Sequence, residues 1–219
     1  MIDQSINKLN SIQDNINKLE ISNSKEVNII CVSKTFSMDK IKPLIDHGHL
    51  HFGENKVQEA DLKWKEIKKN KPEINLHMVG RLQSNKSKKA VEVFDFIHSL
   101  DSIKLANLLK KSEDEQQKKL SYFIQVNIGQ ESQKSGIPAK DTKDFLKYCL
   151  SEINLNVVGL MVLPPDDDNS EKYFSEISKL NSDLGLKHLS MGMSQDYKIA
   201  LKYNSTFLRI GSAIFGPRV

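Results

Sequence analysis

The chain has 219 residues, of which 38% are hydrophobic, so it is long enough to bury the core of one large α/β domain or two small ones. Its 32 basic and 28 acidic residues leave a formal net charge of +4, too small a bias to indicate a nucleic-acid partner. It has no signal-peptide pattern and no apolar run near the roughly 18 residues of a membrane span, so we expect a cytoplasmic protein with no membrane partner.

The first segment, residues 1–21, has the pattern of an amphipathic helix. Ile6, Leu9, Ile12 and Ile16 recur at helical spacing with polar residues between them. Such a helix needs a surface to cover, so we expect it to pack on the rest of the chain.

Eight short apolar segments follow, with helix-like stretches between them. Several carry apolar residues on both faces, as strands that are covered on both sides do. This alternation, in a chain slightly longer than the roughly 200-residue lower limit, predicts a single (β/α)8 TIM-type barrel over residues 1–219, with an extra N-terminal helix. An open doubly wound sheet is the alternative, and its dinucleotide-binding form is disfavoured because no G-x-G-x-x-G follows the first strand. The expected strands begin near residues 27, 49, 75, 96, 120, 157, 188 and 207.

The first expected strand, in the run VNIICVSKTF, carries Lys34 to its carboxyl end, where barrels of this kind build their active sites. Asn28, Ile30 and Val32 share the side of the strand on which Lys34 lies. If that side faces the barrel interior, desolvation lowers the pKa of Lys34 toward the free amine that a Schiff base needs. A solvated strand end is the alternative and the commoner situation for a lysine.

The segments MGMS (191–194) and RIGSAIFG (209–216) end the seventh and eighth expected strands, where barrels often bind phosphate. Ser194 stands where it would cap the next helix, and Gly211 and Ser212 offer backbone N–H groups and a hydroxyl. An ordinary cap and a turn glycine would be the simpler interpretation of either motif alone. Their occurrence together favours a phosphate site.

A lysine beside a phosphate cradle indicates an imine with a phosphorylated aldehyde or ketone. Sugar phosphates and pyridoxal 5'-phosphate (PLP) both satisfy this requirement. Arg209 could hold the phosphate itself or lie against the nitrogen of a pyridine ring, and the spacing of residues leaves both roles open.

Six segments, in their order along the chain, resemble the pyridoxal phosphate homeostasis protein family, whose single barrel is similar to the N-terminal domain of alanine racemase. The resemblance runs from the first strand to the C-terminus. It implies that Lys34 holds PLP as a Schiff base and that Ser194, Gly211 and Ser212 form the phosphate cradle. It also implies that Arg209 lies against the pyridine nitrogen and that Asn55 faces the ring. The segments are VSKT (32–35), HFGENKVQE (51–59), VGRLQSNK (79–86), GLM (159–161), LSMGMS (189–194) and RIGSAIFG (209–216).

The same resemblance implies a PLP-binding protein of intracellular PLP homeostasis with little or no amino-acid turnover. An arginine keeps the ring nitrogen unprotonated and weakens the electron sink, and Lys34 can serve only one face of the imine. The chain ends at Val219, without the additional domain that supplies the second group in alanine racemase. We therefore expect no catalytic residue beyond the attachment lysine; a PLP-dependent racemase or another Schiff-base lysine enzyme is the alternative. PLP-dependent apoenzymes are candidate recipients, and we expect a monomer.

Other polar motifs are assigned no ligand. His49 and His51 share a strand face, but no Cys, Asp or Glu stands at matching spacing, so no metal is expected. His77, His98 and His188 are interpreted as polar members of a packed layer. The basic runs 68–71 and 86–89 lack interleaved aromatic residues and are expected to be solvated. The SQKSG segment (132–136), within the loop 129–137, resembles a family segment and is expected to be a mobile flap near the barrel mouth, with no role assigned to Lys134.

Overall fold

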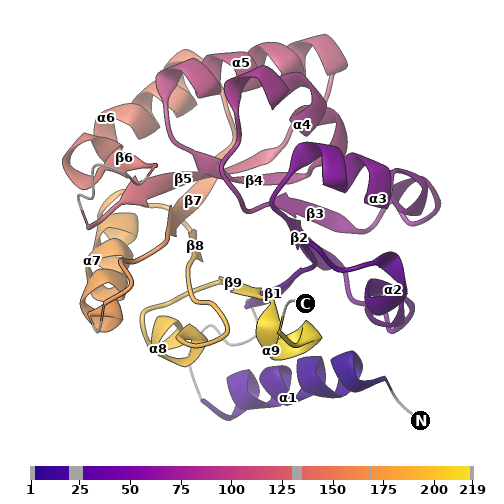
Figure 1. Cartoon of the computed structure of the whole chain (residues 1–219). Helices are drawn as coiled ribbons and strands as arrows, with labels where there is room; N and C mark the ends of the chain where they lie inside the picture. The colour runs from indigo at the N-terminus through magenta and orange to yellow at the C-terminus, as the bar shows by residue number, and fades with distance from the viewer. Residues whose placement is uncertain (1–2, 20–26, 130–134, 168, 218–219) are drawn as a thin grey trace.

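The protein forms a closed parallel barrel with helices around it (Figure 1). The computed structural model describes residues 3–19, 27–129, 135–167 and 169–217. Eight strands pair in the order β1, β2, β3, β4, β5, β7, β8 and β9, and pairing of β9 with β1 closes the ring. The predicted (β/α)8 barrel with an N-terminal helix is confirmed, and the open doubly wound alternative is wrong because the sheet has no open edge between β4 and β5.

The eight barrel strands lie where the apolar segments predict them, within a few residues. The two-residue strand β6 was not predicted; among the described residues it pairs with β5. The strands are β1 (Asn28–Val32), β2 (His51–Glu54), β3 (Asn75–Met78), β4 (Phe96–Leu100), β5 (Ser121–Asn127), β6 (Ile137–Pro138), β7 (Val157–Val162), β8 (His188–Ser190) and β9 (Phe207–Ile210).

Helices follow the strands around the outside of the barrel, and α1 precedes the first strand (Figure 1). Within the described ranges, no helix combines the length and apolar character that a membrane crossing requires. The α-helices are α1 (Gln4–Lys18), α2 (Met38–Asp46), α3 (Val57–Asn70), α4 (Ser87–Val93), α5 (Ile103–Gln116), α6 (Thr142–Lys147), α7 (Ser170–Asp183), α8 (Tyr197–Lys202) and α9 (Ser212–Phe215).

The helix α1 covers the side of the barrel near the two chain ends, where it packs against α2 and α9 (Figure 1). Leu9, Ile12 and Ile16 are buried there, as the helical periodicity predicts. The Asp3 carboxylate accepts a hydrogen bond from the backbone N–H of Ser5 and caps the first turn. Residues 1–2 and 20–21 of the predicted segment 1–21 lie outside the described residues.

Two separate apolar cores result from the alternation of side chains along each strand. On β1, Ile29 and Cys31 point outward into the layer between strands and helices. Ile30 and Val32 point inward, where they join a second cluster inside the barrel with Phe123, Met161 and Phe207. The side of β1 that Ile30 and Val32 share is therefore the interior side, and the strand ends at Val32, two residues before Lys34.

Gly159, in the predicted GLM motif, allows two neighbouring strands to approach closely. A Cβ atom added at this position would lie 1.9 Å from the backbone oxygen of His188. Gly159 pairs with His188 in the parallel ladder between β7 and β8. Glycine is thus required for the register that carries β8 to the site described next.

Candidate functional site

The six predicted site residues lie at or just beyond the carboxyl ends of four strands that meet at one end of the barrel. Lys34 follows β1 by two residues, and Asn55 follows β2 directly. Ser194 follows β8, Arg209 lies within β9, and Gly211 and Ser212 come immediately after it. Because β1 pairs with both β2 and β9, and β9 pairs with β8, these strand ends adjoin one another.

A cavity of about 370 Å³ lies between the ends of β1 and β9. Val32 and Phe36 line it from the first strand and the loop after it, and Gly211, Ser212 and Gly216 line it from the other side. The ring of Phe36 stacks on Phe215, with centroids 4.9 Å apart, and closes one wall. The predicted phosphate-binding glycine and serine therefore face a hollow next to the strand that carries Lys34.

Ser194 makes a different contact from the one predicted. The helix α8 begins only at Tyr197, so the prediction that Ser194 caps it is wrong. Asp196 precedes the helix instead, and its carboxylate accepts from the backbone N–H of Met193 at 2.6 Å. The Ser194 hydroxyl accepts from the N–H of Ala213 at 3.2 Å and so ties the loop after β8 to the start of α9.

The space in front of Gly211 fits a group that approaches the backbone closely. The φ angle of Gly211 is −116°, which other residues also adopt. An added Cβ atom would make only ordinary contacts, 3.5 Å from the Val32 oxygen and 3.7 Å from the Val32 Cβ. The folded chain itself therefore does not require glycine here, and the absence of a side chain leaves more room in the cavity that Gly211 lines.

Arg209 is buried and makes three hydrogen bonds to neutral acceptors. Its Nη1 donates to the backbone oxygen of Ser190 at 2.6 Å and to the Ser190 hydroxyl at 2.7 Å, and its Nη2 donates to the oxygen of Val162 at 2.8 Å. Burial lowers its pKa to about 10. A guanidinium has five N–H groups, so two remain for a further acceptor after the bonds to described residues.

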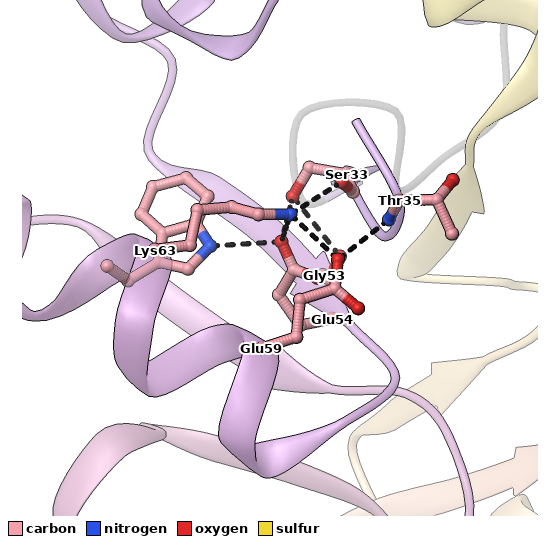
Figure 2. A network of polar contacts seen from close by, with 7 residues as sticks. Ser33, Thr35, Gly53, Glu54, Glu59 and Lys63 are labelled. Atoms are coloured by element: carbon pink, nitrogen blue, oxygen red, sulfur yellow. Dashed lines mark hydrogen bonds and ion pairs between the residues drawn. The ribbon is translucent and has the colours of Figure 1, made fainter. Parts of the chain in front are cut away.

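A polar clamp holds the backbone on both sides of Lys34 (Figure 2). Thr35 has φ 67°, a left-handed conformation that is unusual for a β-branched residue and stores strain. Glu59 Oε1 accepts from the backbone N–H of Thr35 at 2.8 Å, and Lys63 Nζ donates to the backbone oxygen of Ser33 at 3.1 Å. Lys63 and Glu59 also pair with each other at 3.1 Å, which joins the two halves of the clamp.

Glu54, at the end of β2, is the third acidic or basic side chain of the clamp. Its buried Oε1 accepts from the Ser33 hydroxyl at 2.8 Å, from Lys63 Nζ at 2.9 Å and from Trp64 Nε1 at 3.0 Å (Figure 2). Charge-assisted bonds of this kind are shorter and stronger than neutral ones. The geometry of the turn that presents Lys34 is therefore set by β2 and α3.

Asn55 and the end of β3 border a second and larger cavity. It has a volume of about 1010 Å³ and opens at the ends of β2, β3 and β4, where Arg81, Lys86 and Asp101 also line it. A Cβ atom added to Gly80 would lie 2.7 Å from the Asn55 oxygen, so the glycine of the VGRLQSNK motif lets the two strand ends pack together. Burial raises the pKa of Asp101.

Comparison with known proteins agrees with this arrangement. Residues 8–219 match the family described as alanine racemase, N-terminal domain. A pyridoxal phosphate homeostasis protein of Aquifex aeolicus is 35% identical over 199 residues, which cover 87% of this chain and 86% of that protein. The chain belongs to the pyridoxal phosphate homeostasis protein family.

A second relative and two solved structures are similar to this chain over most of its length. The pyridoxal phosphate homeostasis protein of Escherichia coli strain K12 is 35% identical over 204 residues, which cover 89% of this chain and 87% of that protein. The structure of PipY of Synechococcus elongatus without PLP superimposes with a TM-score of 0.87 at 31% identity and covers 98% of this chain and 100% of its own. PipY with PLP bound superimposes with a TM-score of 0.85 at 31% identity, over 97% of this chain and all 100% of that one.

The clamp residues Glu54, Glu59 and Lys63 were not predicted as part of the site from the sequence. Glu54 and Glu59 stand inside the quoted motif HFGENKVQE, yet only Asn55 received a role. The spacing of Glu59 and Lys63, four residues apart on an expected helix, was the available signal of an ion pair. Lys134 and residues 130–134 of the expected loop 129–137 lie outside the described residues.

Proposed function

We propose that this chain binds PLP as a Schiff base on Lys34 and acts in intracellular PLP homeostasis, with little or no amino-acid turnover. The observation that carries this proposal is a pair of features beside the Lys34 strand: a cavity of about 370 Å³ lined by Gly211 and Ser212, and a buried Arg209 that uses three of its five N–H groups in bonds to described residues. The names of the relatives, and PLP in a PipY structure, support it.

Each site residue has a definite task in this proposal. Ser194, Gly211 and Ser212 hold the phosphate through hydroxyl and backbone N–H groups. Asn55 faces the ring from the end of β2, and Arg209 donates a hydrogen bond to the pyridine nitrogen. When bound, PLP supplies an electron sink whose strength depends on the group beside that nitrogen. Arg209 stays protonated at neutral pH, because burial lowers its pKa only to about 10; it would therefore donate a hydrogen bond without transferring its proton, which favours the unprotonated nitrogen and a weak sink.

The runner-up is a PLP-dependent racemase or another Schiff-base lysine enzyme, and a titration followed by a turnover assay separates the two. Purified apoprotein is titrated with PLP and its absorbance is recorded, and the loaded protein is then incubated with L-alanine or L-serine. We expect a new absorbance band that saturates at one PLP per chain, and no racemisation above that of free PLP. Racemisation at enzyme-like rates of 1 s⁻¹ or more, roughly the lower end of the usual range, would show that the protein is an enzyme.

Replacing Gly211 tests the phosphate cradle. Gly211→Ala is expected to leave the melting temperature of the apoprotein nearly unchanged, because the new methyl group meets only Val32 at ordinary distances. PLP affinity is expected to fall by about tenfold or more, since the methyl group occupies the approach to the backbone. Ser212→Thr keeps both the hydroxyl and the N–H and is the matched control, expected to bind PLP normally. Equal affinities of Gly211→Ala and the parent protein would remove Gly211 from the cradle.

We also propose that the protein is a cytoplasmic monomer that supplies PLP-dependent apoenzymes, without nucleic-acid or membrane partners. Cys31 and Cys149 are buried, unbonded thiols, which suit a reducing compartment. The most exposed large apolar side chains, Leu62 on α3 and Ile103 on α5, stand on separate helices and favour a monomer. Light scattering from the purified protein, with and without PLP, tests the monomer directly.

A further inference from the structure

A chain of hydrogen bonds crosses the inside of the barrel and ends at Arg209. His51 Nδ1 lies 3.0 Å from His77 Nε2, and His77 Nδ1 lies 2.9 Å from His98 Nε2. His98 Nδ1 lies 2.8 Å from the Ser190 hydroxyl, which in turn accepts from Arg209 Nη1 at 2.7 Å. Five strands, β2, β3, β4, β8 and β9, each contribute one side chain.

This series of hydrogen bonds runs from one end of the barrel toward the other. His51 is the first residue of β2 and is half-buried, whereas Ser190 ends β8 and Arg209 lies near the end of β9. His77 and His98 are fully buried between them. The hydrogen-bonded side chains therefore link the amino end of the barrel to the end where Lys34 lies.

Aromatic rings hold the two central histidines in place. His77 stacks on Phe96 with centroids 4.4 Å apart, and His98 stacks on Phe123 at 4.3 Å. The ring of Phe207 lies within 6.3 Å of each imidazole of the chain. The imidazoles thus have fixed planes, so their hydrogen bonds have a fixed geometry.

Arg209 determines which atom donates in each hydrogen bond of this series. A guanidinium only donates, so the Ser190 hydroxyl oxygen accepts from it. Among the described residues, His98 Nδ1 is the one acceptor left for the Ser190 proton. If His98 donated to Ser190 instead, the hydroxyl proton would be buried without a partner, which costs about 1–3 kcal/mol.

Once Ser190 donates to His98 Nδ1, the tautomers of the three histidines follow in turn. His98 carries its proton on Nε2 and donates to His77 Nδ1. His77 likewise carries its proton on Nε2 and donates to His51 Nδ1. Burial keeps all three imidazoles neutral: it lowers the pKa of His51 to about 4 and the pKa values of His77 and His98 well below their usual range.

We propose that His77 and His98 are positioning residues for the cofactor: through Ser190, they orient Arg209 so that its two remaining N–H groups face the PLP ring. The Ser190 hydroxyl could otherwise rotate, and with His98 as its acceptor it keeps a lone pair directed at Arg209. The guanidinium is then anchored at Ser190 and Val162 and has one orientation. This inference rests on the proposed function for the identity of the ligand. The donor and acceptor assigned to each hydrogen bond do not depend on PLP.

The first test is the tautomeric state of the histidines in apoprotein labelled with ¹⁵N. Long-range ¹H–¹⁵N correlation spectra at neutral pH distinguish Nε2–H from Nδ1–H imidazoles. We expect the Nε2–H form for His51, His77 and His98, with assignments from single substitutions. An Nδ1–H form at His98 would overturn the proposal, whether or not the protein binds PLP.

The second test compares two replacements of His98 in the PLP-loaded protein. His98→Phe removes the acceptor for Ser190 and is expected to weaken PLP binding by about tenfold and to shift the absorbance maximum of the bound cofactor. His98→Asn keeps an acceptor near the position of Nδ1 and is expected to restore both properties at least in part. His188→Phe is the control: His188 also contacts the ring of Phe207, as the other histidines do, but its described hydrogen bond goes to Thr206, and none of the described hydrogen bonds between His51 and Arg209 includes it.

The outcomes separate this inference from the proposed function. If the parent protein takes up no PLP, the proposed function fails, and the histidine tautomers still show which atom donates in each hydrogen bond between His51 and Arg209. If the parent protein binds PLP and His98→Phe binds it with the same affinity and spectrum, the positioning role is wrong. If His98→Phe does not fold, Ser190→Ala, which removes the link itself, takes its place with the same expected losses.

Discussion

Lys34→Ala is expected to abolish covalent retention of PLP and to leave the barrel folded. In the parent protein, borohydride reduction after PLP loading should add the mass of one phosphopyridoxyl group, and peptide mapping should find it in the segment that contains Lys34. In the variant the amine at position 34 is absent and the nearby amine of Lys63 is paired with Glu54 and Glu59, so the mass after reduction should equal that of the unmodified chain.

The fold is expected to survive this change because the clamp around Lys34 holds the backbone and not the lysine side chain. Glu59 accepts from the N–H of Thr35, and Lys63 donates to the oxygen of Ser33. Circular dichroism and the melting temperature of Lys34→Ala should therefore match those of the parent apoprotein within a few degrees.

Lys56→Ala provides the matched control for the labelling experiment. Lys56 follows Asn55 and lines the cavity of about 1010 Å³, so its amine lies near the same end of the barrel. We expect this variant to be labelled as fully as the parent protein. A phosphopyridoxyl group that persists in Lys34→Ala but is lost in Lys56→Ala would move the attachment to the other lysine and contradict the proposed function.

The architecture could be predicted from the sequence because its signals are local. Each barrel strand is a short apolar run, and the helices between them show helical periodicity, so eight strand positions are readable one at a time. The interior side of β1 also follows from alternation, since Ile30 and Val32 share it and both lie inside the barrel.

The contacts that organise the site could not be predicted, because they join residues that are distant in the chain. His98 and Ser190 are 92 residues apart, and Lys63 and Ser33 are 30 apart. Nothing in a local pattern indicates which interior side chains of a closed ring will meet. His77 and His98 are buried in a packed layer, as expected, but their linkage to Arg209 could be seen only in the closed barrel.

The error at Ser194 has a similar origin. A serine before a helix-like stretch is a good capping residue, but Asp196 is an equally good one and stands two positions nearer to the helix. The local pattern did not decide between them. The start of α9 lies close in space and 19 residues away in the chain, and its Ala213 N–H uses the Ser194 hydroxyl.

Arg209→Leu is expected to cause the largest loss of stability among the substitutions considered, even without PLP. The change removes three hydrogen bonds and leaves the buried oxygens of Ser190 and Val162 without this donor. Each buried acceptor that loses its partner costs about 1–3 kcal/mol, so we expect the free energy of unfolding of the apoprotein to fall by about 2–5 kcal/mol. Urea denaturation of apoprotein measures this loss without a contribution from PLP binding.

Two further variants assign the loss to the geometry of the guanidinium. Arg209→Lys keeps the charge, but one ammonium group cannot match the planar fork that reaches Ser190 and Val162 together, so most of the loss should remain. Arg81→Leu removes an exposed arginine beside the larger cavity and should change stability by only about 0.5 kcal/mol or less. If Arg209→Leu proved as stable as Arg81→Leu, the guanidinium would not be held by these three bonds, and neither the histidine chain nor the contact with the ring nitrogen could depend on it.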